Sequence, residues 1–252
     1  MKLQKNFYAI ILIGGMGSRF SKINQPPKQL IKLNKRSLLE NLIISFVKNG
    51  ISNFVLPLGY KKKYFIDFLE KKKKILKKKV ILHRSTNKEI NANNINIFLF
   101  DAGIRSSKLF RIKQSLRYIS EENFFVTYGD GIANIELNKY LKIFKKKNKV
   151  IIASKYINSQ YGHFKTIKGK LIKFEEKPIL KNPINIGYYF FTKEIFKKFY
   201  KDNYELENQF INKIIKKNKL FIFTHKGFFF NIDRKIDLIN IKKNYRKILL
   251  KL

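Results

Sequence analysis

Apolar and polar positions alternate regularly over the first 155 residues of the chain. Short apolar runs rich in Ile, Val and Phe predict buried strands, and apolar residues spaced three or four apart predict amphipathic helices. Strands are expected at 8–13, 53–57, 80–83, 95–100, 124–128 and 150–154. Helices are expected at 37–49, 64–72, 106–119 and 136–148. Such alternation is typical of the α/β class, with a mostly parallel mixed sheet flanked by helices on both faces.

The helix expected at 37–49 has the clearest ends. Ser37 followed three residues later by Glu40 forms the pattern of a capping box, which satisfies free amides at a helix start. Gly50 stands where a helix commonly ends, because glycine adopts the left-handed conformation of that position at little cost.

The rhythm changes after residue 155. The stretch 163–174 alternates with period two around Lys168-Gly169, which predicts a β-hairpin. Further strands are expected at 185–191, 220–224 and 228–232, and helices at 205–217 and 233–250. We find no internal repeat and no Gly/Ser/Pro-rich linker, so residues 1–252 are expected to form a single domain whose second half carries antiparallel additions.

Composition narrows the class of protein. A chain of 252 residues with 44% apolar residues can bury one sizeable core and is not generally disordered. No apolar run reaches the roughly eighteen residues of a membrane span. The first residues resemble a signal peptide, but the apolar stretch runs into Gly14-Gly15 without a cleavage site. We therefore expect a cytoplasmic protein without a membrane partner.

The formal net charge of +38 is the most unusual property of the composition. The basic residues are overwhelmingly lysine, with eight arginines, and the lysines lie in runs on expected solvent-facing positions. Asn, Ile, Phe, Tyr and Lys all have A/T-rich codons, so a nucleotide bias explains this set more simply than a binding patch. Nucleic-acid-binding surfaces usually add arginines and a recognisable motif. We therefore expect no nucleic-acid partner.

A glycine-rich segment follows the first strand. Gly14, Gly15 and Gly17 leave backbone amides open to an anion, and Arg19 and Lys28 supply two cations. Phe20 replaces the third glycine of a dinucleotide-binding fingerprint, and no Gly-Lys-Ser/Thr of a phosphate-binding P-loop follows. The segment predicts phosphate binding, against the alternative of a tight turn with surface cations.

Two later segments carry carboxylates and a cation. Asp130 lies between glycines at the end of a strand, a position suited to Mg²⁺. Asp233 is the candidate second ligand, with Asp237 as a weaker one, although Asp233 is equally suited to cap the last helix. Phe174–Pro178 (Phe-Glu-Glu-Lys-Pro) places Lys177 beside acidic residues, which is either a solvated turn or a cation near a bound anion.

The ordered set of segments resembles the sugar-phosphate nucleotidyltransferase family, most of all its glucose-1-phosphate cytidylyltransferase branch. The resemblance covers about residues 8–245. It rests on these segments in this order: Gly14–Phe20 with Pro27-Lys28, Val126–Gly131, Tyr161-Gly162, Phe174–Pro178, Ile184–Gly187 and Phe228–Asp233.

The resemblance implies a Rossmann-like nucleotidyltransferase fold of the glycosyltransferase-A kind, with a nucleotide-binding half at about 1–154 and a sugar-binding half at about 155–252. It implies transfer of a nucleotidyl group from an NTP to a sugar 1-phosphate, with pyrophosphate released, for deoxysugar or surface-polysaccharide synthesis. Mg²⁺ is the implied cofactor, NTP and sugar 1-phosphate the implied small-molecule substrates, and a homo-oligomer the implied assembly.

Roles follow from the same resemblance. Catalytic residues are Arg19, Lys28, Asp130 and Lys177, and metal ligands are Asp130 and Asp233. Nucleotide-binding residues are Ile13, Gly14, Gly15, Met16, Gly17, Ser18, Arg19, Lys28, Arg111 and Gly129. Sugar-phosphate-binding residues are Tyr128, Gly162, Glu176, Lys177, Asn185, Gly187 and Glu207.

One segment departs from the family pattern. Lys108, Leu109 and Phe110 stand where the cytidylyl branch has a threonine and paired glycines near the nucleotide base. We expect larger side chains there to crowd or reshape the base pocket, which leaves the base open. Alternative functions are transfer of another nucleotide or to another sugar phosphate, and a non-catalytic nucleotide-sugar-binding homologue.

Overall fold

The computed structural model describes residues 7–15, 25–33, 35–84, 91 and 93–249. Within this part of the chain, nine strands form one sheet in the order β14-β10-β13-β8-β1-β4-β7-β6-β5. Neighbouring strands from β8 through β1, β4 and β7 to β6 are parallel, whereas β13 runs antiparallel to both β8 and β10. The sheet is thus mixed and mostly parallel, as predicted from the sequence.

The sheet strands are β1 (Tyr8–Leu12), β4 (Asn53–Leu58), β5 (Lys74–Ile75), β6 (Lys78–His83), β7 (Ile95–Asp101), β8 (Asn123–Tyr128), β10 (Val150–Lys155), β13 (Ile184–Thr192) and β14 (Leu220–Thr224). Short ribbons outside it pair β2 (Lys32–Leu33) with β3 (Arg36–Ser37), β9 (Gly131–Ala133) with β15 (Phe229–Asn231), and β11 (His163–Ile167) with β12 (Lys170–Glu175).

The helices are α1 (Leu38–Lys48), α2 (Lys62–Glu70), α3 (Lys108–Ser115), α4 (Leu137–Lys147), α5 (Lys193–Phe199), α6 (Asn212–Lys216) and α7 (Lys235–Leu249). Short turns of other helix types are η1 (Lys28–Leu30), η2 (Leu116–Tyr118) and the π-helical η3 (Leu206–Ile211). No helix among these described residues is long and apolar enough to cross a membrane.

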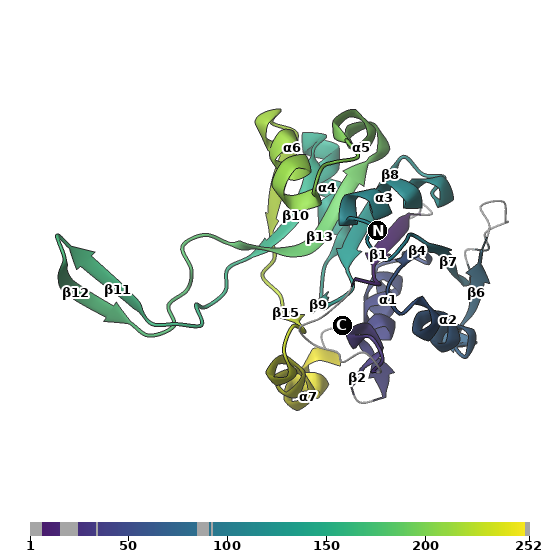
Figure 1. Ribbon diagram of the computed structural model, residues 1–252, viewed down its shortest axis with the longest axis horizontal. Coiled ribbons are helices and arrows are strands. Elements are labelled where there is room, and N and C mark those ends of the chain that lie inside the picture. Colours follow the sequence, from purple (N-terminus) through teal and green to yellow (C-terminus); the bar gives the residue numbers. More distant parts are fainter. Residues whose placement is uncertain (1–6, 16–24, 34, 85–90, 92, 250–252) are drawn as a thin grey trace.

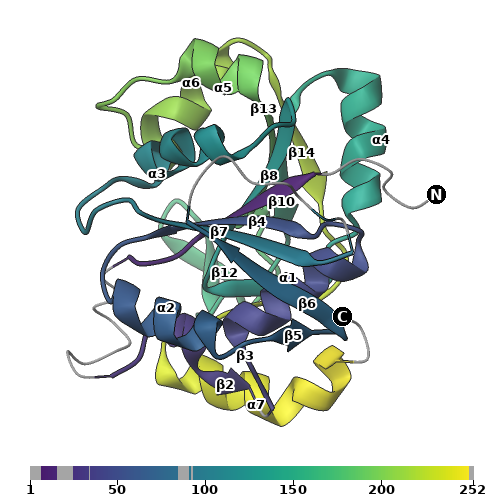
Figure 2. The ribbon, with the colours of Figure 1, turned by 90° about the vertical axis from the view of Figure 1, so that its right-hand side faces the viewer.

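Both faces of the sheet are covered, as Figure 2 shows. Successive residues of β1 point to opposite faces, so Ala9 and Ile11 enter one core with residues of α1, α2 and α4. Tyr8 and Ile10 enter a second core with residues of α3, α5 and η3. This explains why β1 is apolar at every position, since a strand buried on both faces has no polar side.

The predicted start of α1 is confirmed. The Ser37 hydroxyl accepts the Glu40 amide at 3.1 Å, and a Glu40 carboxylate oxygen accepts the Ser37 amide at 2.7 Å. Other boundaries differ from expectation. The helix expected at 205–217 is a π-helical turn followed by the short α6, and α5, which follows directly on β13, was not expected.

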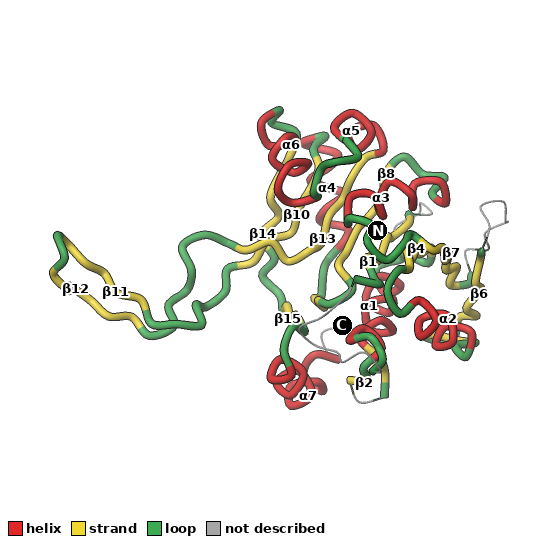
Figure 3. The backbone as a smooth tube through the Cα atoms, in the orientation of Figure 1, coloured by secondary structure: helices red, strands yellow, loops and turns green. Residues whose placement is uncertain are grey.

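The predicted hairpin at 163–174 is present, and it forms an arm. Figure 1 shows β11 and β12 far from the sheet, and Figure 3 shows the loops that join them to β10 and β13. Every residue of the two strands is exposed. We call residues 156–183 the arm. The side chains of the hairpin therefore add little to either core.

Candidate active site

A cavity of about 480 Å³ opens at the carboxyl ends of β1 and β8. In α/β sheets, ligands bind at this end of the parallel strands, because the loops that follow the strands converge there. The cavity is lined by Leu12, Ile13, Gly15, Lys28, Gln29, Ile104, Arg105, Ser106, Lys108, Arg111, Tyr128, Gly129 and Asp130. Of the residues predicted to bind the nucleotide, Ile13, Gly15, Lys28, Arg111 and Gly129 thus meet around one space.

The glycine turn after β1 needs glycine at position 14. Gly14 has a φ of +82°, and a Cβ built on it would lie 2.5 Å from the backbone nitrogen of Gly59. The Tyr60 amide donates to the Gly14 carbonyl at 2.9 Å, which ties the turn to the end of β4. The predicted residues Met16, Gly17, Ser18 and Arg19 lie outside the described residues.

Arg111 holds this turn by hydrogen bonds to its backbone carbonyls. Its guanidinium is buried and donates to the carbonyls of Ile13 at 2.6 Å and of Gly14 at 3.3 Å. It also donates to the Gly103 carbonyl at 3.1 Å, which joins the turn to the loop before α3. Burial lowers the pKa of Arg111, but these carbonyl acceptors satisfy its donors. In the described contacts, Arg111 therefore shapes the side of the cavity that the sequence predicts to bind the nucleotide.

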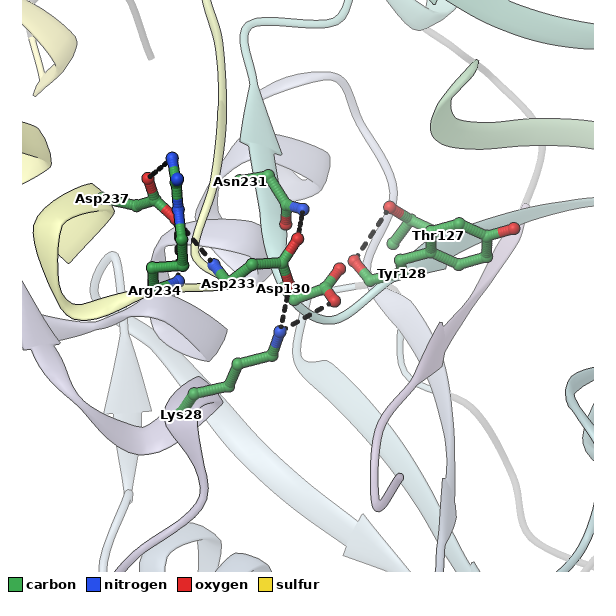
Figure 4. Close-up of polar contacts among 8 residues, drawn as sticks. All are labelled: Lys28, Thr127, Tyr128, Asp130, Asn231, Asp233, Arg234 and Asp237. Atoms are coloured by element: carbon green, nitrogen blue, oxygen red, sulfur yellow. Dashed lines mark hydrogen bonds and ion pairs between the residues drawn. The ribbon is translucent and has the colours of Figure 1, made fainter. Parts of the chain in front are cut away.

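Lys28 joins the two predicted metal ligands, as Figure 4 shows. Its ammonium donates to Asp130 Oδ2 at 3.0 Å and to Asp233 Oδ1 at 2.9 Å, and the lysine side chain is 12% exposed. The small ribbon of β9 and β15 brings the two aspartates together, because Gly131 pairs with Asn231. The Ile232 amide also donates to the Asp130 carbonyl at 2.9 Å. Two carboxylates 103 residues apart in the sequence thus converge on one cation.

Asp233 and Asp237 have different surroundings. Asp233 Oδ2 accepts from the Asn231 amide group at 2.6 Å, so both carboxylate oxygens of Asp233 have partners. Asp237 Oδ2 instead accepts the amides of Asp233 at 3.2 Å and Arg234 at 2.8 Å, just before α7. The carboxylate of Asp237 therefore serves the start of α7, and that of Asp233 faces Lys28.

Three residues predicted to bind the sugar phosphate meet beside Tyr128, which is a residue of the cavity lining. The Tyr128 hydroxyl lies 2.5 Å from the Tyr189 hydroxyl and donates to Glu207 Oε1 at 2.5 Å. Asn185 Nδ2 donates to the Tyr189 hydroxyl at 2.6 Å. Gly187 leaves room for the Tyr128 ring, since a Cβ there would lie 2.5 Å from Tyr128 Cδ2. These residues form one network across β8, β13 and η3.

Three other predicted residues lie on the arm. Gly162 precedes β11, and Glu176 and Lys177 follow β12. The Lys177 ammonium lies 3.6 Å from a Glu176 carboxylate oxygen, and both side chains are about 60% exposed. None of the three is among the residues that line the cavity. The structure therefore does not bring Gly162, Glu176 and Lys177 together with Lys28, Asp130 and Asp233.

The expected crowding by 108–110 is wrong for two of its three residues. Leu109 is fully buried in the core between the sheet and α3. Phe110 is not among the residues that line the cavity. The reason is helical geometry: Ser107 caps α3 by accepting the Phe110 amide at 3.1 Å, which turns Leu109 inward. Only Lys108 lines the cavity.

Sequence reasoning missed Tyr189 and Asn231. Tyr189 could have been found, because residues two apart in a strand share a face and Asn185, Gly187 and Tyr189 follow this spacing. Asn231 is the last residue of β15 and stands two residues before Asp233, which follows that strand. No local pattern indicates that Arg111 would reach carbonyls almost a hundred residues earlier.

A mostly parallel sheet with a glycine turn, cations and paired carboxylates at its carboxyl edge defines a Rossmann-like nucleotide-binding class. The chain belongs to the nucleotidyl transferase family, which it matches over residues 8–220. The resemblance inferred from the ordered motifs is thereby confirmed.

Individual relatives agree with this assignment. The chain is 28% identical to the probable glucose-1-phosphate cytidylyltransferase of Bacillus subtilis, over 95% of this chain and 96% of the relative. It is 33% identical to the D-glycero-alpha-D-manno-heptose 1-phosphate guanylyltransferase of Campylobacter jejuni, over 76% and 78% of the two chains. The crystal structure of HddC from Yersinia pseudotuberculosis has a TM-score of 0.68 at 21% identity, covers 95% and 99% of the chains, and supports the fold. Within its family, the chain groups with sugar-1-phosphate nucleotidyltransferases.

Proposed function

We propose that the protein transfers a cytidylyl group from CTP to glucose 1-phosphate, giving CDP-glucose and pyrophosphate for deoxysugar or surface-polysaccharide synthesis. A phosphate oxygen of the sugar phosphate attacks the α-phosphorus of CTP, and the bond from that phosphorus to the pyrophosphate oxygen breaks. The observation that carries the proposal is the convergence of Asp130 and Asp233 on one cation at the edge of the cavity.

The paired carboxylates fit Mg²⁺. Both lie within 3.0 Å of the Lys28 ammonium, so they already face one cation-sized point. Among the described residues, no group of three or more His, Cys, Asp and Glu side chains could enclose a metal. Mg²⁺ usually binds through one or two carboxylates together with phosphates and water, which this pair allows. When bound, Mg²⁺ supplies neutralisation of the phosphate charge.

In this proposal Lys28 also binds phosphate groups of the nucleotide. With Mg²⁺ on the two carboxylates, the Lys28 ammonium would be free to bind the β- and γ-phosphates and to stabilise the leaving pyrophosphate. The backbone of the Gly14-Gly15 turn, fastened by Arg111, holds the nucleotide beside it. Phosphoryl-group chemistry needs little covalent participation by the protein, so positioning and charge neutralisation supply the catalysis.

The base and sugar are the finer part of the proposal. The Bacillus subtilis relative supports CTP because the match covers nearly the whole of both chains. The Campylobacter jejuni relative, at higher identity over a shorter span, supports a second candidate, transfer of a guanylyl group to another sugar 1-phosphate. In either case Lys108 is the residue of the divergent segment that faces the cavity.

Pyrophosphate release tests the proposal directly. The purified protein is incubated with Mg²⁺, with CTP, UTP, dTTP, GTP or ATP, and with glucose 1-phosphate or a panel of other sugar 1-phosphates. We expect turnover with CTP and glucose 1-phosphate, abolished by EDTA. Turnover with GTP and another sugar phosphate would support the second candidate. No turnover with any pair, despite nucleotide-sugar binding by calorimetry, would identify a non-catalytic homologue.

A further inference from the structure

A carboxylate beside the cavity is held by two donors from different elements. Glu207, in the π-helical turn η3, accepts the Tyr128 hydroxyl at 2.5 Å and the Lys108 ammonium, both on Oε1. Tyr128 and Lys108 themselves line the cavity. The Lys108 ammonium also lies 4.8 Å from the centre of the Tyr128 ring. Lys108, Tyr128 and Glu207 thus form a closed triangle, in which Lys108 and Tyr128 line the cavity and Glu207 contacts both.

The local structure explains how Lys108 reaches this position. Ser107 is the cap of α3, so Lys108 is the first residue of the helix, next to the loop that lines the cavity. Leu109 is anchored in the core, which fixes the direction in which Lys108 leaves the helix. The side chains of Lys108 and Glu207 are 45% and 34% exposed, so the ion pair is only partly screened by water.

We propose that Lys108 is a positioning residue that holds the partly exposed Glu207 carboxylate beside the cavity as a hydrogen-bond acceptor for hydroxyls of the substrate sugar. This inference rests on the proposed function, because it assigns the sugar side of the same site. It concerns a lysine that replaces the threonine of the family pattern. Lys108 therefore acts through Glu207, and its removal is expected to weaken sugar-phosphate binding more than nucleotide binding.

The protonation of Glu207 provides the test. Burial raises the pKa of Glu207, but the hydrogen bonds from Lys108 and Tyr128 hold the pKa of this carboxyl below its ordinary value. The titratable and charged groups that face Glu207 are Lys108 from α3, Tyr128 from β8 and Tyr189 from β13. Burial raises the pKa of Tyr128 and raises the pKa of Tyr189 to about 12, so both tyrosines stay protonated at neutral pH.

Removing the ammonium leaves the effect of burial without its main counterweight. In Lys108→Met the pKa of Glu207 should rise, so on acidification Glu207 becomes protonated at a higher pH than in the wild type and loses acceptor capacity. We expect the ratio of this variant's KM for the sugar phosphate to that of the wild type to stay below about twofold at pH 8.5 and to grow as the pH falls, toward the tenfold limit that a shift of about one pKa unit sets. The KM for the nucleotide should stay within about twofold.

Three further variants and the wild type complete the kinetic experiment. Lys108→Arg should restore the wild-type pH profile, and Glu207→Gln should show a raised KM for the sugar phosphate at every pH. Lys139→Met is the matched control, because it removes an exposed Lys–Glu pair of 2.7 Å on α4. Wild type supplies the intrinsic titration of the substrate phosphate, which all variants share. A pH-independent loss in Lys108→Met without rescue by Lys108→Arg, or a rise confined to the nucleotide KM, overturns the proposal.

A measurement without turnover separates this inference from the proposed function. The carboxyl carbon of Glu207 is followed by NMR in protein labelled at the glutamate δ-carbon, and the signal is assigned by its absence in Glu207→Gln. The inference requires an upward shift of the Glu207 pKa in Lys108→Met and none in Lys139→Met. An unchanged pKa overturns it even if the enzyme is active. Failure of turnover in wild type, with the pKa shift present, overturns the proposed function and leaves Lys108 as the residue that controls Glu207.

Discussion

The nucleotide side of the cavity and the arm are built in opposite ways. The Gly14 turn is held by backbone contacts to Gly59 and Tyr60 and by the buried guanidinium of Arg111. On the arm, every residue of β11 and β12 is exposed, and Lys177 contacts its own neighbour Glu176. Packing thus determines the shape of the cavity lining around the Gly14 turn before any ligand binds, whereas the arm presents charged groups on a projecting ribbon that does not line the cavity.

This difference indicates where binding energy is spent. A turn that is already held in place, such as the Gly14 turn, loses little conformational freedom when a ligand binds. Ordering exposed lysine side chains costs about 0.5–1.5 kcal/mol each. Substitutions on the nucleotide side should therefore affect both folding and catalysis. Substitutions on the arm should affect the handling of the sugar phosphate while leaving the stability of the core unchanged.

The largest effect is expected for Asp130→Asn, at a residue of the cavity lining. The amide keeps the shape of the carboxylate but removes the charge that faces the cation, and kcat should fall by at least about 10²–10³-fold. The free energy of unfolding should change little because Asp130 is partly exposed. Pyrophosphate release measures kcat, and the electron paramagnetic resonance of Mn²⁺ measures metal binding.

Asp237→Asn is the control for this substitution. It lies close in sequence to Asp233, and an asparagine can still accept the amides before α7. It should retain near-wild-type kcat and Mn²⁺ affinity. An Asp130→Asn protein with near-normal turnover would remove Asp130 from the proposed metal site.

Arg111→Met tests whether the nucleotide side is really preformed. The substitution removes one donor from each of the carbonyls of Ile13, Gly14 and Gly103. The Gly14 carbonyl keeps the Tyr60 amide and the Gly103 carbonyl keeps the Ser106 hydroxyl, so the free energy of unfolding should fall by about 1–3 kcal/mol. The KM for the nucleotide should rise, since the turn loses its support. Urea denaturation measures the stability, and Arg117→Met, an exposed arginine just after α3, provides the control. Equal stabilities of the two variants would contradict the clamp.

Lys177→Ala tests the arm. The family resemblance assigns the Lys177 ammonium to the sugar phosphate, and on that assignment its loss should raise the KM for glucose 1-phosphate about tenfold, which corresponds to about 1.4 kcal/mol. The thermal midpoint should not move, because Lys177 is exposed. Lys165→Ala, an exposed lysine of the same arm, should leave both quantities unchanged. If both lysine variants behave alike, Lys177 has no specific role.

The elements that sequence predicted best are those with a local cause. The apolar runs of β1, β4 and β8 follow from burial on both faces, and the start of α1 follows from the pair Ser37 and Glu40. The contacts that build the site have no such local cause. Lys28 meets Asp130 and Asp233 across separations of 102 and 205 residues, so their meeting depends on the ribbon of β9 and β15.

The errors also have physical reasons. The pattern around 205–217 matches an α-helix, and periodicity alone does not distinguish the wider π-helical turn that carries Glu207. The replacement of glycines by Leu109 and Phe110 looked like an obstacle at the base, because the sequence does not reveal which residues of a helix start face the core. The capped α3 turns Leu109 inward and leaves Lys108 at the cavity.

The smallest effect is expected for Phe164→Ala on the arm. Phe164 is 68% exposed, and its ring centre lies 5.3 Å from that of Phe174. Its removal should lower the free energy of unfolding by less than about 1 kcal/mol, the range for an exposed aromatic pair. Phe125→Ala removes a side chain that is 2% exposed in the sheet core and should cost about 3–5 kcal/mol.

The ratio of these two losses in urea denaturation measures the contrast between the regions. A loss for Phe164→Ala comparable to that for Phe125→Ala would mean that the arm is packed against another surface in solution. The arm would then be as preformed as the nucleotide side, and the small stability effect expected for Lys177→Ala would have to be reconsidered, because Lys177 follows the same ribbon. A ratio near the expected one would mean that the packed sheet and the Arg111 contacts are rigid, whereas the arm contributes through its charged groups.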